Sequence, residues 1–104
     1  MEKSLHVNAV VFREGEAWVI QGVEYDIVAH AVELTDLVRA FERAVVANLV
    51  VSAHLGRAPL EGVPPASSRF RAMLEQAEQK LPHVHPGPAD PSVPSVDVWM
   101  AATA

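Results

Sequence analysis

An apolar run over residues 18–27, crossed by Gln21, Glu24 and Asp26, is followed directly by a long helical pattern. Stretches rich in β-branched and aromatic residues favour strands, because such side chains fit a pleated, half-buried surface. The run therefore predicts a β-hairpin that leads into a helix, with carboxylates in or beside the sheet.

Three strands are predicted in the first third of the chain. Residues 4–12 alternate with the two-residue period of a strand, so odd-numbered and even-numbered side chains face opposite sides of the sheet. Residues 13–16 supply a turn in which Gly15 can adopt a positive φ, and residues 17–22 form the second strand. Residues 25–30 form a third strand, which alternates in the same way.

A long helix is predicted from Thr35, whose hydroxyl can cap it, to about Leu55, where Gly56 offers a left-handed stop. At 3.6 residues per turn, one side of this helix is a broad apolar face. Its members are Leu37, Val38, Phe41, Val45, Leu49, Val51 and Leu55. The other side begins charged and becomes apolar, and its candidates for a contact between subunits are Val46, Val50 and Ala53. The alternative is that the second helix or the tail covers these residues.

A second helix is predicted after a proline-rich loop over residues 57–66, with Ser67 or Ser68 as its cap and Leu81, before Pro82, as its end. Its apolar residues have helical spacing: Phe70, Met73, Leu74, Ala77 and Leu81.

Five of the eight prolines lie between residues 82 and 94, and they predict an extended spacer. Residues 96–100 alternate again and predict a fourth strand, which returns to the sheet of the same or a neighbouring subunit. Three of its side chains are further candidates for the subunit interface: Val96, Val98 and Trp99.

Together these elements predict an α+β fold of order β-β-β-α-α-β, in which an antiparallel sheet of three to four strands packs on one long helix. We expect one α+β domain over residues 1–81, a spacer over 82–94 and the returning strand within 95–104.

Composition restricts the function further. The formal net charge is −5 and the eight Lys and Arg residues are scattered, whereas nucleic-acid binding depends on cationic side chains. A basic protein is therefore the favoured partner. The absence of cysteine excludes disulfides, thiol nucleophiles and cysteine zinc sites. Because no run approaches the roughly 18 apolar residues of a membrane span and the start lacks a signal pattern, we expect a cytoplasmic protein without membrane association.

The local pattern Trp18-Val19-Ile20-Gln21, Glu24-Tyr25-Asp26-Ile27 and Leu34-Thr35-Asp36-Leu37, on three short strands and a long helix, resembles the HicB-like family of small bacterial proteins. The resemblance covers about residues 4–55. It implies a reduced ribonuclease-H-like sheet with one helix packed on it, and an antitoxin whose partner is a small basic ribonuclease with a double-stranded-RNA-binding-like fold. Residues 56–104 are similar to a bacterial subgroup that ends in a proline spacer and a last strand.

Two departures from the family pattern bear on function. This chain has Gly22-Val23-Glu24-Tyr25 where the family has proline-glycine before the third strand, and Glu33-Leu34-Thr35 where it has Gly-Asp-Thr before the helix. The family's usual C-terminal DNA-binding module is replaced by one helix, the spacer and a strand, so no DNA binding is expected from this chain alone.

Candidate catalytic groups are few. Glu24 and Asp26 would share a face of a regular strand and, with Asp97, could hold a divalent cation in a vestigial ribonuclease-H-like nuclease. A second candidate metal ligand is the pair His83 and His85, which lacks an evident third ligand. We expect neither a metal nor a cofactor, and instead interpret the acids as solvated or paired.

The favoured hypothesis is a non-enzymatic protein that forms a dimer or tetramer and binds another protein through an acidic edge formed by Glu24, Tyr25 and Asp26. The alternatives are the metal nuclease and an RNA-binding module that stacks bases on Trp18, Tyr25 and Trp99.

Overall fold

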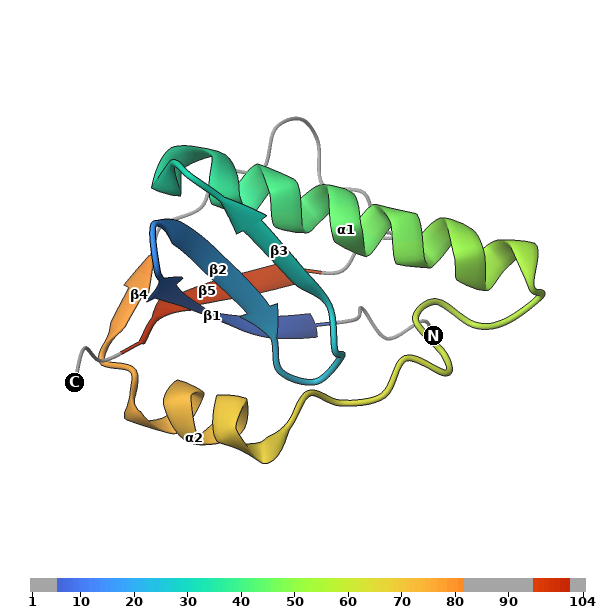
Figure 1. Ribbon diagram of the computed structural model, residues 1–104. Coiled ribbons are helices and arrows are strands. Elements are labelled where there is room, and N and C mark those ends of the chain that lie inside the picture. The colour runs from blue at the N-terminus through green and yellow to red at the C-terminus, as the bar shows by residue number, and fades with distance from the viewer. Residues whose placement is uncertain (1–5, 82–94, 102–104) are drawn as a thin grey trace.

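The chain forms an α+β structure in which a five-stranded mixed sheet carries one helix on each face (Figure 1). The computed structural model describes residues 6–81 and 95–101. Its elements in chain order are β1 (His6–Glu14), β2 (Ala17–Gly22), β3 (Val28–Ala31), α1 (Leu34–His54), α2 (Ser68–Gln76), β4 (Gln79–Leu81) and β5 (Ser95–Met100). In the sheet the strands lie in the order β3-β2-β1-β5-β4, so β3 and β4 are its edges.

The first three strands form the predicted antiparallel meander. The β1–β2 turn contains Gly15 at a φ of 63°, a conformation that costs glycine little. The alternation in β1 is confirmed, since Val7, Ala9 and Val11 lie in the core beneath α1, while Phe12 stacks on Phe70 of α2 with ring centroids 5.9 Å apart. Both faces of β1 are therefore covered, each by a different helix.

The predicted all-antiparallel sheet of three to four strands is wrong. β5 pairs with β1 in parallel, with Val7 opposite Val96 and Ala9 opposite Val98. A parallel pair needs a long connection that crosses over the sheet, and α1 and α2 lie in that connection.

The second helix is shorter than predicted, because it ends at Gln76 and residues 79–81 form β4. Leu81 precedes Pro82, and a residue before proline is disfavoured in helical conformation. The backbone instead pairs with β5, where Leu81 lies opposite Val98. The apolar pattern up to Leu81 thus belongs to a helix and a strand in succession.

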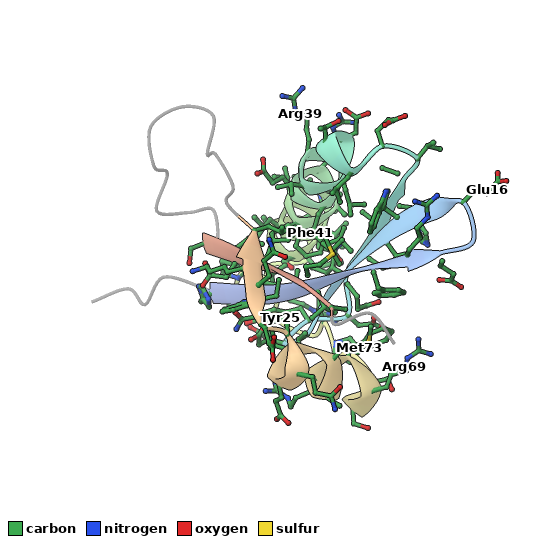
Figure 2. All side chains as sticks on the ribbon, turned by 90° about the vertical axis from the view of Figure 1, so that its left-hand side faces the viewer. Glu16, Tyr25, Arg39, Phe41, Arg69 and Met73 are labelled. Carbon is green, nitrogen blue, oxygen red and sulfur yellow. The ribbon has the colours of Figure 1, made fainter. Side chains whose placement is uncertain are left out.

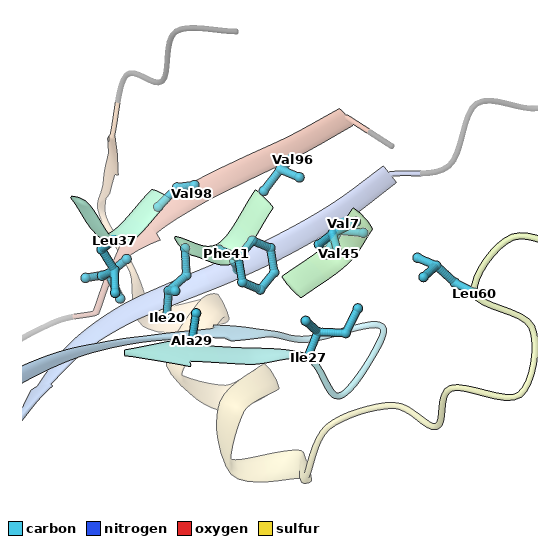
Figure 3. Close-up of a cluster of buried hydrophobic side chains, with 12 residues drawn as sticks. Val7, Ile20, Ile27, Ala29, Leu37, Phe41, Val45, Leu60, Val96 and Val98 are labelled. Carbon is cyan, nitrogen blue, oxygen red and sulfur yellow. The ribbon is translucent and has the colours of Figure 1, made fainter. Parts of the chain in front are cut away.

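Helix α1 packs on the sheet through Leu37, Phe41 and Val45, which are buried against Ile20, Val98 and their neighbours (Figure 3). The predicted stop is confirmed, since the helix ends at His54 and Gly56 follows with a φ of 70°. The predicted cap at Thr35 is wrong. Glu33 occupies the N-cap position without a side-chain hydrogen bond, and Thr35 lies inside the helix.

The last turns of α1 extend past the strands (Figure 1). For this reason Val51 and Leu55, predicted on the buried face, are 57% and 56% exposed. Inside this region Ser52 is buried, and its Oγ accepts a hydrogen bond from the Leu60 N–H at 3.2 Å. Leu60 itself is buried at a φ of 62°, so the loop after α1 is anchored under the helix.

Candidate functional site

The acids predicted to face a partner lie in the loop between β2 and β3, where the predicted third strand has not yet begun. The Glu24 carboxylate accepts two hydrogen bonds of 2.7 Å, from the backbone N–H and the side-chain amide of Asn8. The Asn8 Oδ1 in turn accepts a hydrogen bond from Trp99 Nε1 at 3.3 Å. Glu24 therefore ties the loop to β1 and, through Asn8, to β5.

Of the other two residues of the predicted edge, only Asp26 is more exposed than Glu24. Asp26 is exposed, and its Oδ1 accepts a 2.9 Å hydrogen bond from the side-chain amide of the buried Gln21. Tyr25 is half-buried and packs against the core. Of the predicted edge, Asp26 is thus the one carboxylate directed to solvent.

A second polar cluster joins β1, β5 and β4. Asp97 forms salt bridges with Lys80 at 2.8 Å and with His6 Nε2 at 3.0 Å, while His6 Nδ1 lies 2.8 Å from Ser95 Oγ. Lys80 also lies 5.7 Å from the centre of the Trp99 ring. Sequence reasoning singled out Asp97 but missed its partners, because His6 and Lys80 reach it only through strand pairings between distant segments.

Serine, histidine and aspartate in hydrogen-bonded series are the groups of a hydrolase triad. Here the contacts follow from strand register alone, since His6 is directly opposite Ser95 and Asp97 lies on the same face of β5 two residues further. The other Asp97 oxygen, Oδ1, is bound by Lys80. We interpret the cluster as a cross-strand contact that holds the edge strand β4 and β5 to β1.

The three acids of the nuclease hypothesis do not converge. Glu24 is bound to Asn8, whereas Asp97 is bound to His6 and Lys80. No group of three or more His, Cys, Asp or Glu side chains that could hold a metal occurs among residues 6–81 and 95–101. The predicted ligands His83 and His85 lie outside the described residues.

The aromatic side chains do not share one surface. Trp18 belongs to the face of β2 that carries Ile20, on the side of α1, whereas Trp99 projects from β5 on the side opposite Val98. Each lies near one cation, Arg13 and Lys80 respectively. A single stacking platform for nucleic acid would require these rings on the same face.

Large exposed apolar side chains fall into two groups. One lies on α1 and the residue after it, with Val46, Val50, Val51 and Leu55 exposed by 44%, 62%, 57% and 56%. The other is Val28 on β3 and Val32 just after it, exposed by 44% and 75%.

The candidates for a subunit interface are divided by this exposure. Val46, Val50 and Ala53 are on the surface, and a shallow groove on α1 passes Arg39, Glu42, Arg43, Val46 and Ala47. Val96 and Val98 lie in the core of the chain's own sheet, and Trp99 is half-buried. Of the predicted interface residues, those that remain on the surface are thus on α1 rather than on β5.

Neither described helix is long and apolar enough to cross a membrane. Comparison with protein-family models, with curated proteins and with solved structures found no match.

Proposed function

We propose that this chain is a non-enzymatic, cytoplasmic HicB-like protein of the antitoxin type, which self-associates and binds another protein. The antiparallel meander of β1, β2 and β3 with α1 on one face supports this proposal, since the resemblance implies a small sheet with one helix on it. The additional β5 and β4 extend the sheet beyond β1, and α2 covers the face opposite α1.

The exposed apolar end of α1 is the observation that carries the proposal. Val46 and Val50 are four residues apart and therefore share one face of the helix. Exposed apolar surface marks protein–protein contacts in soluble proteins. Val46 and Val50 are about half exposed, so covering each would contribute roughly 1 kcal/mol, about half the value for burying a valine completely. A second copy on this surface would increase the buried apolar area of a domain whose small size limits its own core.

The charge indicates the chemistry of a different partner. In the described part of the chain both salt bridges use Asp97, so the other carboxylates are not neutralised by ion pairs. The pairing of Trp18 with Ala31 brings the β1–β2 turn to the same end of the sheet as the start of α1 (Figure 2). This end contains the exposed carboxylates of Glu14, Glu16, Glu33 and Asp36, which outnumber the exposed guanidinium groups of Arg13 and Arg39. A small basic protein, such as the ribonuclease toxin that the resemblance implies, suits this end. Asp26 lies at the opposite end of β2 and β3, where Gln21 pairs with Val28, and is a separate candidate contact.

The decisive experiment is co-expression with the product of the adjacent gene. We expect that product to be a small basic protein that co-purifies in a defined ratio. The pair Glu16→Lys and Glu33→Lys should weaken the complex, and Asp26→Lys tests the loop separately. Glu75→Lys on α2 is the control with the same kind of charge change. An adjacent product that is not small and basic, or that does not bind, would overturn the antitoxin assignment.

Self-association is tested without the partner. Light scattering at micromolar concentration should give a mass above that of one chain, and Val50→Lys should lower it. A strict monomer would contradict self-association. Magnesium- or manganese-dependent cleavage of RNA by the purified chain would instead favour the nuclease, and a shift of RNA mobility at low salt would favour the RNA-binding module.

A further inference from the structure

The second group of exposed apolar side chains lies at an edge of the sheet. β3 pairs with β2 on one side, and within the described residues no strand pairs with its other side. Val28 and His30 are exposed on the face of β3 that points away from α1, and Val32, which is also exposed, follows in the bend after the strand ends at Ala31. Ala29 is buried towards α1.

The two edges of the sheet differ in how they are protected. β4 has three residues, includes Lys80 in a salt bridge with Asp97, and is followed by Pro82 in the sequence. Short length, lysine and proline are the usual means by which an edge strand avoids pairing with another chain. Residues 28–32 contain no proline, lysine or other permanently charged side chain. The β3 edge is therefore open to a further strand.

The sequence of this edge is self-complementary. Residues 28–32 read Val-Ala-His-Ala-Val, which is the same in both directions about His30. A twofold contact brings the same patch of two copies together, so residue i meets j and j meets i. With the two His30 residues opposite each other across the axis, antiparallel strands would pair each Val28 with Val32 of the other copy and each Ala29 with Ala31. Apolar side chains then meet apolar ones, small ones meet small ones, and the one titratable side chain, His30, faces its counterpart without a permanent charge.

We propose that two copies of this chain associate through β3, in antiparallel pairing centred on His30, and thereby join their five-stranded sheets into one. The axis passes midway between the two His30 residues, and directly opposite residues of antiparallel strands point to the same face. The two α1 helices therefore lie on the same face of the joined sheet. A register shifted by one residue would turn one copy over and place Val28 opposite Ala31. The occupant of the edge is thus a second copy in one defined register.

This contact is distinct from the α1 surface and does not depend on the antitoxin assignment. Val46 and Val50 are on the helix, whereas Val28 and Val32 belong to the sheet edge. If both contacts form, each chain has two different twofold contacts, and loss of one leaves dimers held by the other.

The absence of cysteine makes the register directly testable. Directly opposite residues of an antiparallel pair have Cα atoms about 4.5–5.5 Å apart, within the range that a disulfide spans. His30→Cys should therefore give covalent dimers on mild oxidation. Val28→Cys and Val32→Cys should not cross-link efficiently alone, but their mixture should. Glu75→Cys, exposed on α2, is the control for random collision.

Paired thiols meet at roughly millimolar effective concentration, so His30→Cys should cross-link about a thousandfold faster than Glu75→Cys at micromolar protein. Equal rates would overturn the proposal, as would efficient cross-linking of Val28→Cys by itself. His30→Lys should halve the mass of a β3-linked assembly, and an unchanged mass would also contradict the proposal. Adding Val50→Lys to His30→Cys should leave cross-linking intact, which separates this contact from the one on α1.

Discussion

Replacing Glu24 by glutamine tests whether this acid is a structural anchor or part of a partner-facing edge. The two carboxylate oxygens accept hydrogen bonds from the backbone N–H and the side-chain amide of Asn8. Glutamine keeps one acceptor and introduces an amide donor, which must then face a donor of Asn8. Turning the Asn8 amide over does not solve the conflict, because its NH2 group would then face the N–H of Trp99.

The expected loss follows from these contacts. Hydrogen bonds to a charged group contribute about 1.5–3 kcal/mol each, and a neutral one about 1 kcal/mol. Since Glu24→Gln loses one bond and weakens the other, we expect unfolding free energy to fall by roughly 2 kcal/mol in urea titrations. In a domain of this length that corresponds to a melting temperature lower by about 10 °C. Asp26→Asn is the matched control, because the exposed Asp26 accepts only from Gln21 and asparagine keeps that oxygen.

A double-mutant cycle makes the test specific to this network. In a Trp99→Phe background Asn8 can turn its amide, so Glu24→Gln should cost about 1 kcal/mol less than in the wild-type chain. If Glu24→Gln and Asp26→Asn have the same urea midpoint as the wild type, the reasoning is refuted. Glu24 would then be available to a partner in the same way as Asp26.

Three further changes test the packing of the fold. Phe41→Ala empties a fully buried position and should lower the unfolding free energy by about 3–5 kcal/mol in urea. Gly22→Ala should destabilise the chain measurably by thermal melting, because its Cβ would lie 2.7 Å from the Tyr25 carbonyl oxygen, a backbone atom. Ser52→Ala should cost about 1–3 kcal/mol and speed hydrogen exchange at the Leu60 amide, which loses its acceptor; unchanged exchange there would contradict that hydrogen bond.

Local patterns were sufficient to predict several elements in the first half of the fold. The alternation in β1 and β2, the left-handed stop at Gly56 and the buried row of Leu37, Phe41 and Val45 all depend on neighbours within a few residues. These features are set by strand and helix periods, which can be read without knowing what the elements pack against.

Features that depend on distant segments could not be predicted in this way. A two-residue spacing placed Glu24 and Asp26 on one face of a strand, but the chain is a loop there and Asn8, sixteen residues earlier, binds Glu24. Likewise the apolar pattern up to Leu81 fits one helix, whereas pairing with β5 makes its end a strand. Long-range pairing thus decided both the role of the acid and the identity of the element.

The sequence about His30 shows why topology must come before an inference about association. The palindrome over residues 28–32 is visible in the sequence, yet in a central strand both sides of these residues would already be paired. The strand order shows that β3 is at the edge of the sheet, and Val28 and Val32 are exposed there. Only with this knowledge can a second copy be expected to pair with the symmetric segment. By the same reasoning Val96 and Val98, on a strand between β1 and β4, are core residues, although their alternation resembles that of an exposed edge.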